Sequence, residues 1–191
     1  GRLPDGAVDL YELKAQNLKA IDDNSLDVVL CHWALTLMNP ITPVLNEVNR
    51  VLSSGGRFAA LVDGPMKAAP KYSDVHNLIY RFVQAKIPKY GEIDLGDPRI
   101  RSTDRSKNLL HEAFPDAKVN IETSVVSMEG PVTEVAETAA GFFYASFVLP
   151  TETHRIMLSE LSNLLAISKE SGDLKRQGRF SMPINRLVIT K

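Results

Sequence analysis

The chain has 191 residues, a formal net charge of −1 and a sequence pI of about 6.5. Hydrophobic residues make up 44% of it and charged residues 24%, which is typical of a globular protein and excludes a disordered polymer, a collagen and a disulfide scaffold. The near-neutral charge argues against nucleic acid or an anionic membrane as the main partner. This length favours a single domain.

Cysteine usage and hydropathy indicate a cytoplasmic protein. Cys31 is the only cysteine, so an internal disulfide is excluded and a reducing compartment fits best. The longest apolar stretch, residues 139–149, falls short of the ~18 residues that span a bilayer, and no signal peptide is recognisable. Because the first residue is glycine and not methionine, we expect a processed or trimmed piece.

The first third of the chain predicts a strand–helix–strand unit. Residues 26–31 (LDVVLC) are almost uniformly apolar and rich in β-branched residues, which predicts a strand buried on both faces of a parallel sheet. Apolar residues then recur at helical spacing over residues 44–52. We expect Ser53-Ser54-Gly55-Gly56 to end that helix, because glycine readily adopts the left-handed cap conformation. Residues 58–62 predict a second buried strand, parallel to the first.

The flanking segments complete an α/β fold with an antiparallel pair late in the chain. Ser73 is predicted to cap a helix that runs to about residue 85. The other expected elements are a short strand at 7–13, a loop at 87–101, a helix from 102 or 103 to 114, a strand at 119–128, helices at 133–147 and 151–168, a turn at 171–173 and a closing strand at 184–190.

Two motifs in this region resemble a known family. Asp22-Asp23-Asn24-Ser25-Leu26-Asp27-Val28-Val29 is similar to an acidic turn, D-N-S-F-D-V-V, that opens the fourth strand of class I S-adenosylmethionine-dependent methyltransferases, especially the ubiquinone/menaquinone-biosynthesis type. Residues 45–58 resemble the helix L-x-E-x-x-R-V-L-K-P-G-G that leads into the fifth strand of that family. Ser53-Ser54 replaces the lysine–proline pair. The strong motifs cover about residues 14–63.

The resemblance implies a fold, a domain and a cofactor. It implies an incomplete Rossmann-like methyltransferase sheet with parallel strands, a C-terminal antiparallel hairpin and helices on both faces. One methyltransferase-like domain then spans residues 1–191, with substrate or lid helices within residues 66–170. The implied cofactor is S-adenosylmethionine, which the family holds through a glycine-rich loop. Gly1 and Gly6 are the only glycines before residue 55, so we expect a chain that lacks this loop.

Apart from the glycine-rich loop, the resemblance implies three cofactor-binding residues in this chain: Lys14, Ala15 and His32. Lys14 and Ala15 occupy the positions that hold the adenine, where the family has an acidic or amide residue followed by alanine. Lysine departs from that pattern because an ammonium only donates hydrogen bonds. His32 matches a position near the methionine part of the cofactor.

Ligands of open α/β sheets bind at the carboxyl ends of strands, where three candidate site residues lie. His32 is a candidate general base because imidazole titrates near neutral pH, and the alternative is a packed, hydrogen-bonded residue. Trp33 is a candidate for substrate binding or for filling the core. Asp63 follows the second buried strand and is a candidate for substrate contact or for a turn.

Other reactive side chains favour structural roles. Cys31 is expected to be a small buried hydrophobe, since no base is paired with it. No spacing of His, Cys, Asp and Glu indicates a metal site. Three tyrosines near one loop predict either a substrate lid or helix packing: Tyr72, Tyr80 and Tyr90. A mixed charge run predicts a solvated loop: Asp94, Asp97, Arg99, Arg101, Asp104 and Arg105.

Two functions remain open from the sequence. The first is an enzyme that transfers the sulfonium methyl group to a small-molecule acceptor by direct displacement. In that reaction the protein positions and desolvates the reactants. The second is a truncated or degenerate methyltransferase-like module without activity, which acts through self-association as a homodimer. Neither hypothesis involves nucleic acid or a membrane.

Overall fold

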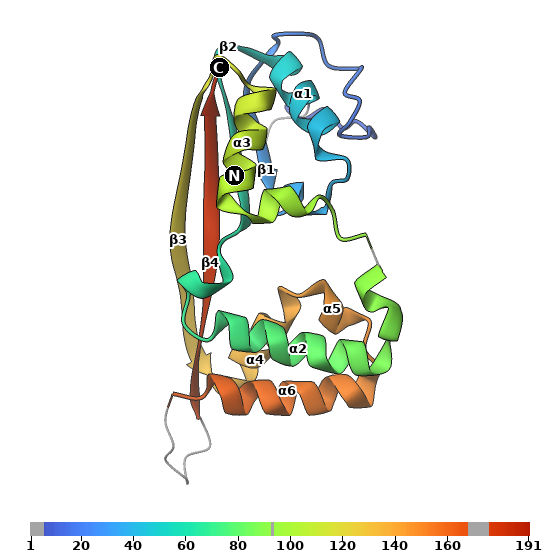
Figure 1. Cartoon of the computed structure of the whole chain (residues 1–191), viewed down its shortest axis with the longest axis vertical. Coiled ribbons are helices and arrows are strands. Elements are labelled where there is room, and N and C mark those ends of the chain that lie inside the picture. The colour runs from blue at the N-terminus through green and yellow to red at the C-terminus, as the bar shows by residue number, and fades with distance from the viewer. Residues whose placement is uncertain (1–5, 93, 168–175) are drawn as a thin grey trace. The chain divides into compact units, whose positions relative to one another are not determined.

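A computed structural model describes residues 6–92, 94–167 and 176–191. It has a mixed α/β fold (Figure 1). The elements are β1 (Leu26–His32), η1 (Leu35–Leu37), α1 (Ile41–Val51), β2 (Leu52–Asp63), η2 (Met66–Ala68), α2 (Tyr72–Lys86), η3 (Pro88–Glu92), η4 (Pro98–Arg101), α3 (Thr103–Ala113), β3 (Lys118–Pro131), α4 (Val132–Gly141), α5 (Tyr144–Phe147), α6 (Thr151–Leu165) and β4 (Gln177–Thr190).

The described strands form one four-stranded sheet in the order β1-β2-β4-β3. β1 and β2 are parallel, with Val28 opposite Arg57 and His32 opposite Leu61. The other pairings are antiparallel, and Ser127 on β3 bonds Ser181 on β4 through their hydroxyls at 2.8 Å. The predicted strand–helix–strand unit and the late antiparallel pair are both confirmed.

The chain divides into two compact units. The first unit comprises residues 1–62, 95–122 and 186–191, and the second comprises residues 63–94 and 123–185. β3 and β4 contribute residues to both units. Each unit has its own buried side chains.

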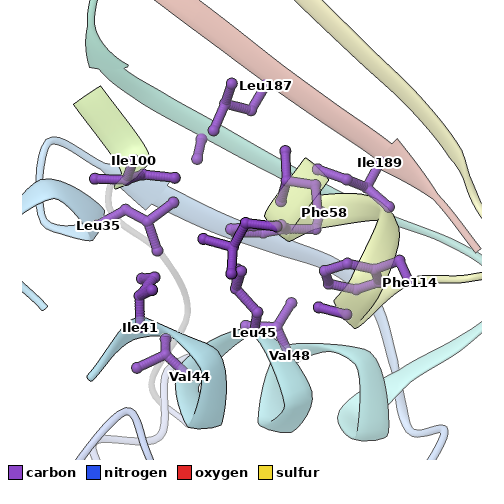
Figure 2. Packing of buried hydrophobic residues seen from close by; sticks show 14 of the residues in the cluster. Leu35, Ile41, Val44, Leu45, Val48, Phe58, Ile100, Phe114, Leu187 and Ile189 are labelled. Atoms are coloured by element: carbon purple, nitrogen blue, oxygen red, sulfur yellow. The ribbon is translucent and has the colours of Figure 1, made fainter. Parts of the chain in front are cut away.

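The core of the first unit lies between α1, α3 and one face of the sheet. Figure 2 shows Leu45 and Val48 of α1, Phe58 of β2 and Phe114 after α3 pointing toward one another. The rings of Phe58 and Phe114 stack with centroids 6.3 Å apart. The helical spacing of apolar residues thus places one face of α1 in the core, as predicted.

A network of charged groups fixes the segment before β1 against α1. The backbone N–H of Leu18 donates to Glu47 Oε2 at 2.6 Å. The Arg50 guanidinium bonds Glu47 and Asp23 and donates to the carbonyls of Leu18 and Ile21, both at 3.0 Å. The Arg50 hydrogen bond and the Leu18 amide lower the pKa of Glu47. Glu47 and Arg50 therefore hold the segment before β1 against α1, an arrangement called here the Glu47 clamp.

The predicted end of α1 is wrong. Leu52 is already extended and begins β2, so Ser53, Gly55 and Gly56 belong to that strand. Gly55 has φ +79° but does not cap the helix, and its N–H donates to the carbonyl of Lys191 at 2.8 Å. Pairing with the chain end holds this segment as strand.

β1 was predicted to be buried on both faces, but only one of its faces is buried. Val29 and Cys31 pack against the core, whereas Val28 is 55% exposed and Leu30 76% exposed. β1 is an edge strand, and the opposite face of its apolar run is open among the described residues. Residues 7–13, expected as a strand, have no strand assignment, and Val8, Leu10 and Tyr11 are exposed there.

In the second unit α2, α4, α5 and α6 pack together, with α2 and α6 side by side (Figure 1). Ser73 does not cap α2, because its hydroxyl donates to the carbonyl of Met66 and the cap position is Lys71. The helix expected at 133–147 is interrupted after Gly141 and becomes α4 and α5. The turn predicted at 171–173 lies outside the described residues.

The loop predicted at 87–101 contains two short helical turns, η3 and η4, instead of irregular chain throughout. Asp97 is buried and caps η4, where its carboxylate accepts from the backbone and side chain of Arg99. The prediction of a wholly solvated charge run is therefore wrong for Asp97. The helix predicted from 102 or 103 to 114 is confirmed as α3, with Ser102 as its N-cap residue.

Replacing Phe58 with alanine tests the core of the first unit. Phe58→Ala removes a fully buried ring, and we expect it to lower the free energy of unfolding by about 3–5 kcal/mol. Urea denaturation measures the change. Leu37→Ala, at an exposed apolar residue, is the control and should change stability by at most about 0.5 kcal/mol. Equal effects of the two substitutions would contradict this packing.

The Glu47 clamp predicts a specific loss of stability in acid. The pKa of Glu47 is lowered below its ordinary value of 4.5, so its contribution is complete above about pH 4.5 and is lost as the pH falls through the lowered value. Glu47→Gln should therefore lower the free energy of unfolding at pH 7, and the difference from wild type should shrink in acid. Urea denaturation at both pH values measures this, with the exposed Glu137→Gln as control. A pH-independent difference would contradict the assignment.

Candidate functional site

His32 and Trp33 lie at the carboxyl end of β1. Trp33 has φ +59°, in the left-handed region, and this bend follows directly after the strand. Its N–H donates to the carbonyl of Leu61 at 3.0 Å, and its carbonyl accepts from Thr36 Oγ1 at 3.2 Å. The bend places the ring centroids of His32 and Trp33 5.2 Å apart.

The side chain of His32 is exposed, and its ring makes no hydrogen bond with the described residues. A packed, hydrogen-bonded strand end does not describe this histidine. The ring is therefore available to a ligand. Trp33 is half-buried and offers an aromatic surface beside it.

The two residues expected at the adenine position have different environments. Lys14 is exposed, and its carbonyl accepts from the N–H of Asn17 at 2.8 Å in a turn. Ala15 is half-buried and packs against the core of the first unit. The turn is thus anchored through Ala15, while the Lys14 ammonium can only donate to a ligand.

Cys31 is half-buried against the core. Burial raises the pKa of its thiol, and hydrogen bonds from the backbone of Leu35 and Ala34 act weakly in the opposite direction. A raised thiol pKa disfavours the thiolate, which is the nucleophilic form. The structure agrees with the interpretation of Cys31 as a small hydrophobe.

Asp63 is the last residue of β2 and belongs to the second unit, where its charge affects two aromatic side chains of α2. Burial raises the pKa of the Tyr72 phenol, and the negative charges of Asp63 and of ionised Tyr80 raise it further. Burial lowers the pKa of His76, against smaller opposite effects of Asn77 and Asp63. His76 is therefore neutral, and Tyr72 keeps its proton, at physiological pH.

These residues belong to a set of packed rings, called here the aromatic cluster: Tyr72, His76, Tyr80, Tyr90, Phe143 and Phe180. The His76 ring stacks on Tyr80 with centroids 4.2 Å apart and meets the edge of Phe143 at 5.9 Å. Tyr72 lies 5.7 Å from Phe143 and 6.1 Å from Phe180. The three tyrosines predicted as lid or packing residues all make ring contacts in this cluster, which agrees with the packing alternative.

His76 was not among the predicted site residues, although its spacing from two tyrosines of α2 could have indicated it. Residues 72, 76 and 80 are four apart, so their side chains lie along one face of α2. A row of Tyr, His and Tyr at this spacing is a polar aromatic stripe on an otherwise apolar helix face. Its meaning depends on Phe143 and Phe180, which the chain supplies from far along the sequence.

Glycine at position 64 is required by close backbone contact. Its N–H donates to the carbonyl of Pro183 at 2.9 Å, and an added Cβ would lie 2.8 Å from the Pro183 carbonyl carbon. The chain leaves β2 after Asp63 against the backbone of β4. This contact fixes the position of Asp63 within the second unit.

An open groove of about 320 Å³ lies between α2 and α6 in the second unit. Arg81 and Glu160 form an ion pair across it. Its charges are therefore largely matched within the protein. Among residues 6–92, 94–167 and 176–191, no group of three or more His, Cys, Asp and Glu side chains is placed to hold a metal ion. Within the same residues, no helix is long and apolar enough to span a bilayer.

Comparisons with known proteins find a matching family model for part of the chain and a curated relative. Residues 2–60 match a family described as a methyltransferase domain. The chain is 32% identical over 119 residues to a mitochondrial protein of Schizosaccharomyces pombe named 2-methoxy-6-polyprenyl-1,4-benzoquinol methylase. The alignment covers 59% of this chain and 35% of that protein, so the chain spans about a third of the length of the curated relative.

Two solved structures show the same fold. One is a protein of Bacillus halodurans assigned as a methyltransferase, with a TM-score of 0.54 and 13% identity, covering 96% of this chain and 78% of the other. The second is an Anabaena variabilis protein assigned as a methyltransferase from an antibiotic biosynthesis pathway, with a TM-score of 0.52 and 13% identity, covering 96% and 74%. Residues 2–60 are thus similar to a methyltransferase domain, and the chain shares its fold with both solved structures.

Proposed function

We propose that this chain is an S-adenosylmethionine-dependent methyltransferase of the ubiquinone/menaquinone-biosynthesis type that acts on a small molecule. The observation that carries the proposal is the family match over residues 2–60, of which residues 26–60 lie in the parallel β1-α1-β2 unit. The yeast relative, named as a benzoquinol methylase, supports a small aromatic acceptor. The methyl acceptor and S-adenosylmethionine are the ligands of this proposal.

The residues present do not fit the whole cofactor. No glycine lies between residues 7 and 54, so no glycine-rich loop precedes β1 in this stretch. Exposed Lys14 offers donors where the adenine amino group needs an acceptor. We therefore propose that this chain lacks the cofactor loop and is inactive alone.

Within this proposal the sequence candidates keep their roles. His32 serves as general base or contacts the methionine part of the cofactor, while Lys14 and Ala15 adjoin the adenine. Trp33 and Asp63 contact the substrate. The exposed ring of His32 and its contact with Trp33 support a ligand at this strand end. If the accepting atom is oxygen or carbon, His32 accepts the proton that this atom releases.

A chimera tests the proposed function and the role of His32. The region of the yeast methylase that corresponds to residues 6–122 of this chain is replaced by these residues, which include both His32 and His111. We expect the chimera to bind S-adenosylhomocysteine and to transfer methyl groups, while this chain alone shows no calorimetric binding. His32→Gln in the chimera should lower kcat by about 10²-fold or more, the usual contribution of general-base catalysis.

The matched control is His111→Gln, at another exposed histidine in the first unit, and it should leave kcat unchanged. A folded chimera without methyl transfer would overturn the proposed function. Equal kcat values for the two histidine variants would overturn only the role of His32.

The comparisons do not favour an inactive module as the function of this chain. Self-association remains a separate proposal, supported by the exposed apolar residues Val28 and Leu30 on the edge strand β1. Light scattering of the purified chain should give the mass of a dimer, and Leu30→Lys should give a monomer. A wild-type monomer would contradict the homodimer and leave the enzymatic proposal unaffected.

A further inference from the structure

The backbone leaves β1 through a conformation that few side chains adopt. Trp33 has φ +59°, which is uncommon for any residue other than glycine and especially for a bulky one. Such a conformation persists only where surrounding contacts hold it, and it is found most often at functional sites. The turn also sets the position of the Trp33 ring, 5.2 Å from the ring of His32. The contacts that hold this turn therefore hold two candidate site residues together.

Thr36 makes one of these contacts from within the turn. Its hydroxyl donates to the carbonyl of Trp33 at 3.2 Å. Thr36 is only 4% exposed, so this hydroxyl cannot bond bulk solvent instead. Loss of the hydroxyl would leave the Trp33 carbonyl without this donor and would free the turn.

The segment at residues 95–101 holds Thr36 in turn. The Arg101 guanidinium donates to the carbonyl of Thr36 at 3.2 Å and also to the carbonyl of Leu95. Gly96 lies so close that an added Cβ would be 2.2 Å from the carbonyl oxygen of Thr36. Two contacts from this one segment thus fall on the residue that bonds Trp33.

Asp97 anchors the same segment to the chain that follows the turn. Its N–H donates to the carbonyl of Met38 at 3.1 Å, and its buried carboxylate accepts from the Arg99 guanidinium at 2.7 Å and from the N–H of Ile41. Arg99 also donates to Thr42 Oγ1 at 3.3 Å. The hydrogen bonds to Asp97, that of the Arg99 side chain foremost, lower its pKa and keep it ionised at neutral pH. All these residues belong to the first unit.

These contacts reach His32 only through Trp33. The imidazole is exposed, and its ring contact is with Trp33. Whatever fixes the Trp33 ring therefore limits the directions that the imidazole can take. A chain of contacts runs from Arg101 through Thr36 and Trp33 to the candidate general base.

We propose that Thr36 and Arg101 are positioning residues for the end of β1. Arg101 holds Thr36, Thr36 holds the turn at Trp33, and the Trp33 ring restricts the imidazole of His32 to one orientation. The catalytic meaning of this inference rests on the proposed function, in which His32 is the general base. The positioning itself is measured without cofactor or substrate.

The fluorescence of Trp33 reports on this turn alone, because Trp33 is the single tryptophan of the chain. A protonated imidazole quenches an indole that it contacts. Lowering the pH from about 8 to about 5, the range in which imidazole titrates, should therefore quench the emission of the wild-type chain. His32→Gln should abolish this quenching. Circular dichroism at each pH verifies that the chain stays folded.

Two substitutions of Thr36 separate the hydroxyl from the shape of the side chain. Thr36→Val keeps the shape, removes the donor and should lose most of the acid quenching, whereas Thr36→Ser keeps the donor and should retain it. Arg101→Met should also lose it, and the double variant Thr36→Val with Arg101→Met should lose no more than either alone, since both act through one turn. The matched control is Thr138→Val, at an exposed threonine of the second unit, with quenching as in the wild type.

A merely structural role of Thr36 and Arg101 would lower stability and leave the quenching of the folded variants unchanged. Wild-type quenching in folded Thr36→Val would thus overturn the proposal, even where Arg101→Met fails to fold. A wild-type chain without acid quenching, or quenching that persists in His32→Gln, would overturn it as well.

The chimera then measures the consequence for catalysis. Thr36→Val in the chimera should lower kcat by up to about 10²-fold, because a small misplacement of a catalytic group is costly, and Thr36→Ser should restore it. An inactive wild-type chimera would overturn the proposed function and leave the fluorescence result standing. Loss of quenching in Thr36→Val with unchanged kcat would overturn the catalytic meaning of the positioning.

Discussion

The contact of Glu47 and Arg50 with the segment before β1 organises the first unit. Arg50 holds two backbone carbonyls and two carboxylates, while Glu47 accepts the amide of Leu18. These groups belong to a helix whose other face is the core, so one helix fixes both the core and the chain that enters the sheet. The start of β1, and hence the position of His32 at its end, depends on this arrangement.

This clamp gives the family motif a physical meaning. An apolar stripe alone would set which face of α1 is buried, but not where the preceding segment lies. The paired charges at positions 47 and 50 sit one turn apart, and both face the segment at residues 18–23. In this chain the charged residues of the motif make a tertiary contact between α1 and the segment that precedes β1.

The sequence predicted those elements whose determinants are local. The apolar run of β1, the helical spacing of α1 and the second run of β2 each carry their own signal, and all three elements were found in the predicted order, with different bounds for α1 and β2. The errors fall where distant residues decide. Gly55 lies in a strand because it pairs with Lys191, and Leu30 is exposed because no described neighbour covers that side of β1.

The candidate sites divide in the same way. His32 and Trp33 could be predicted because a strand end is a local feature with a general relation to ligands. The aromatic cluster could not, because Tyr72 and His76 of α2 meet Phe143 and Phe180 only in the folded chain. Burial in that cluster, more than the charge of Asp63, sets the direction of the pKa shifts of Tyr72 and His76. A strand end can thus be found from a run of apolar residues, whereas the protonation state of a buried group depends on neighbours that are distant in the sequence.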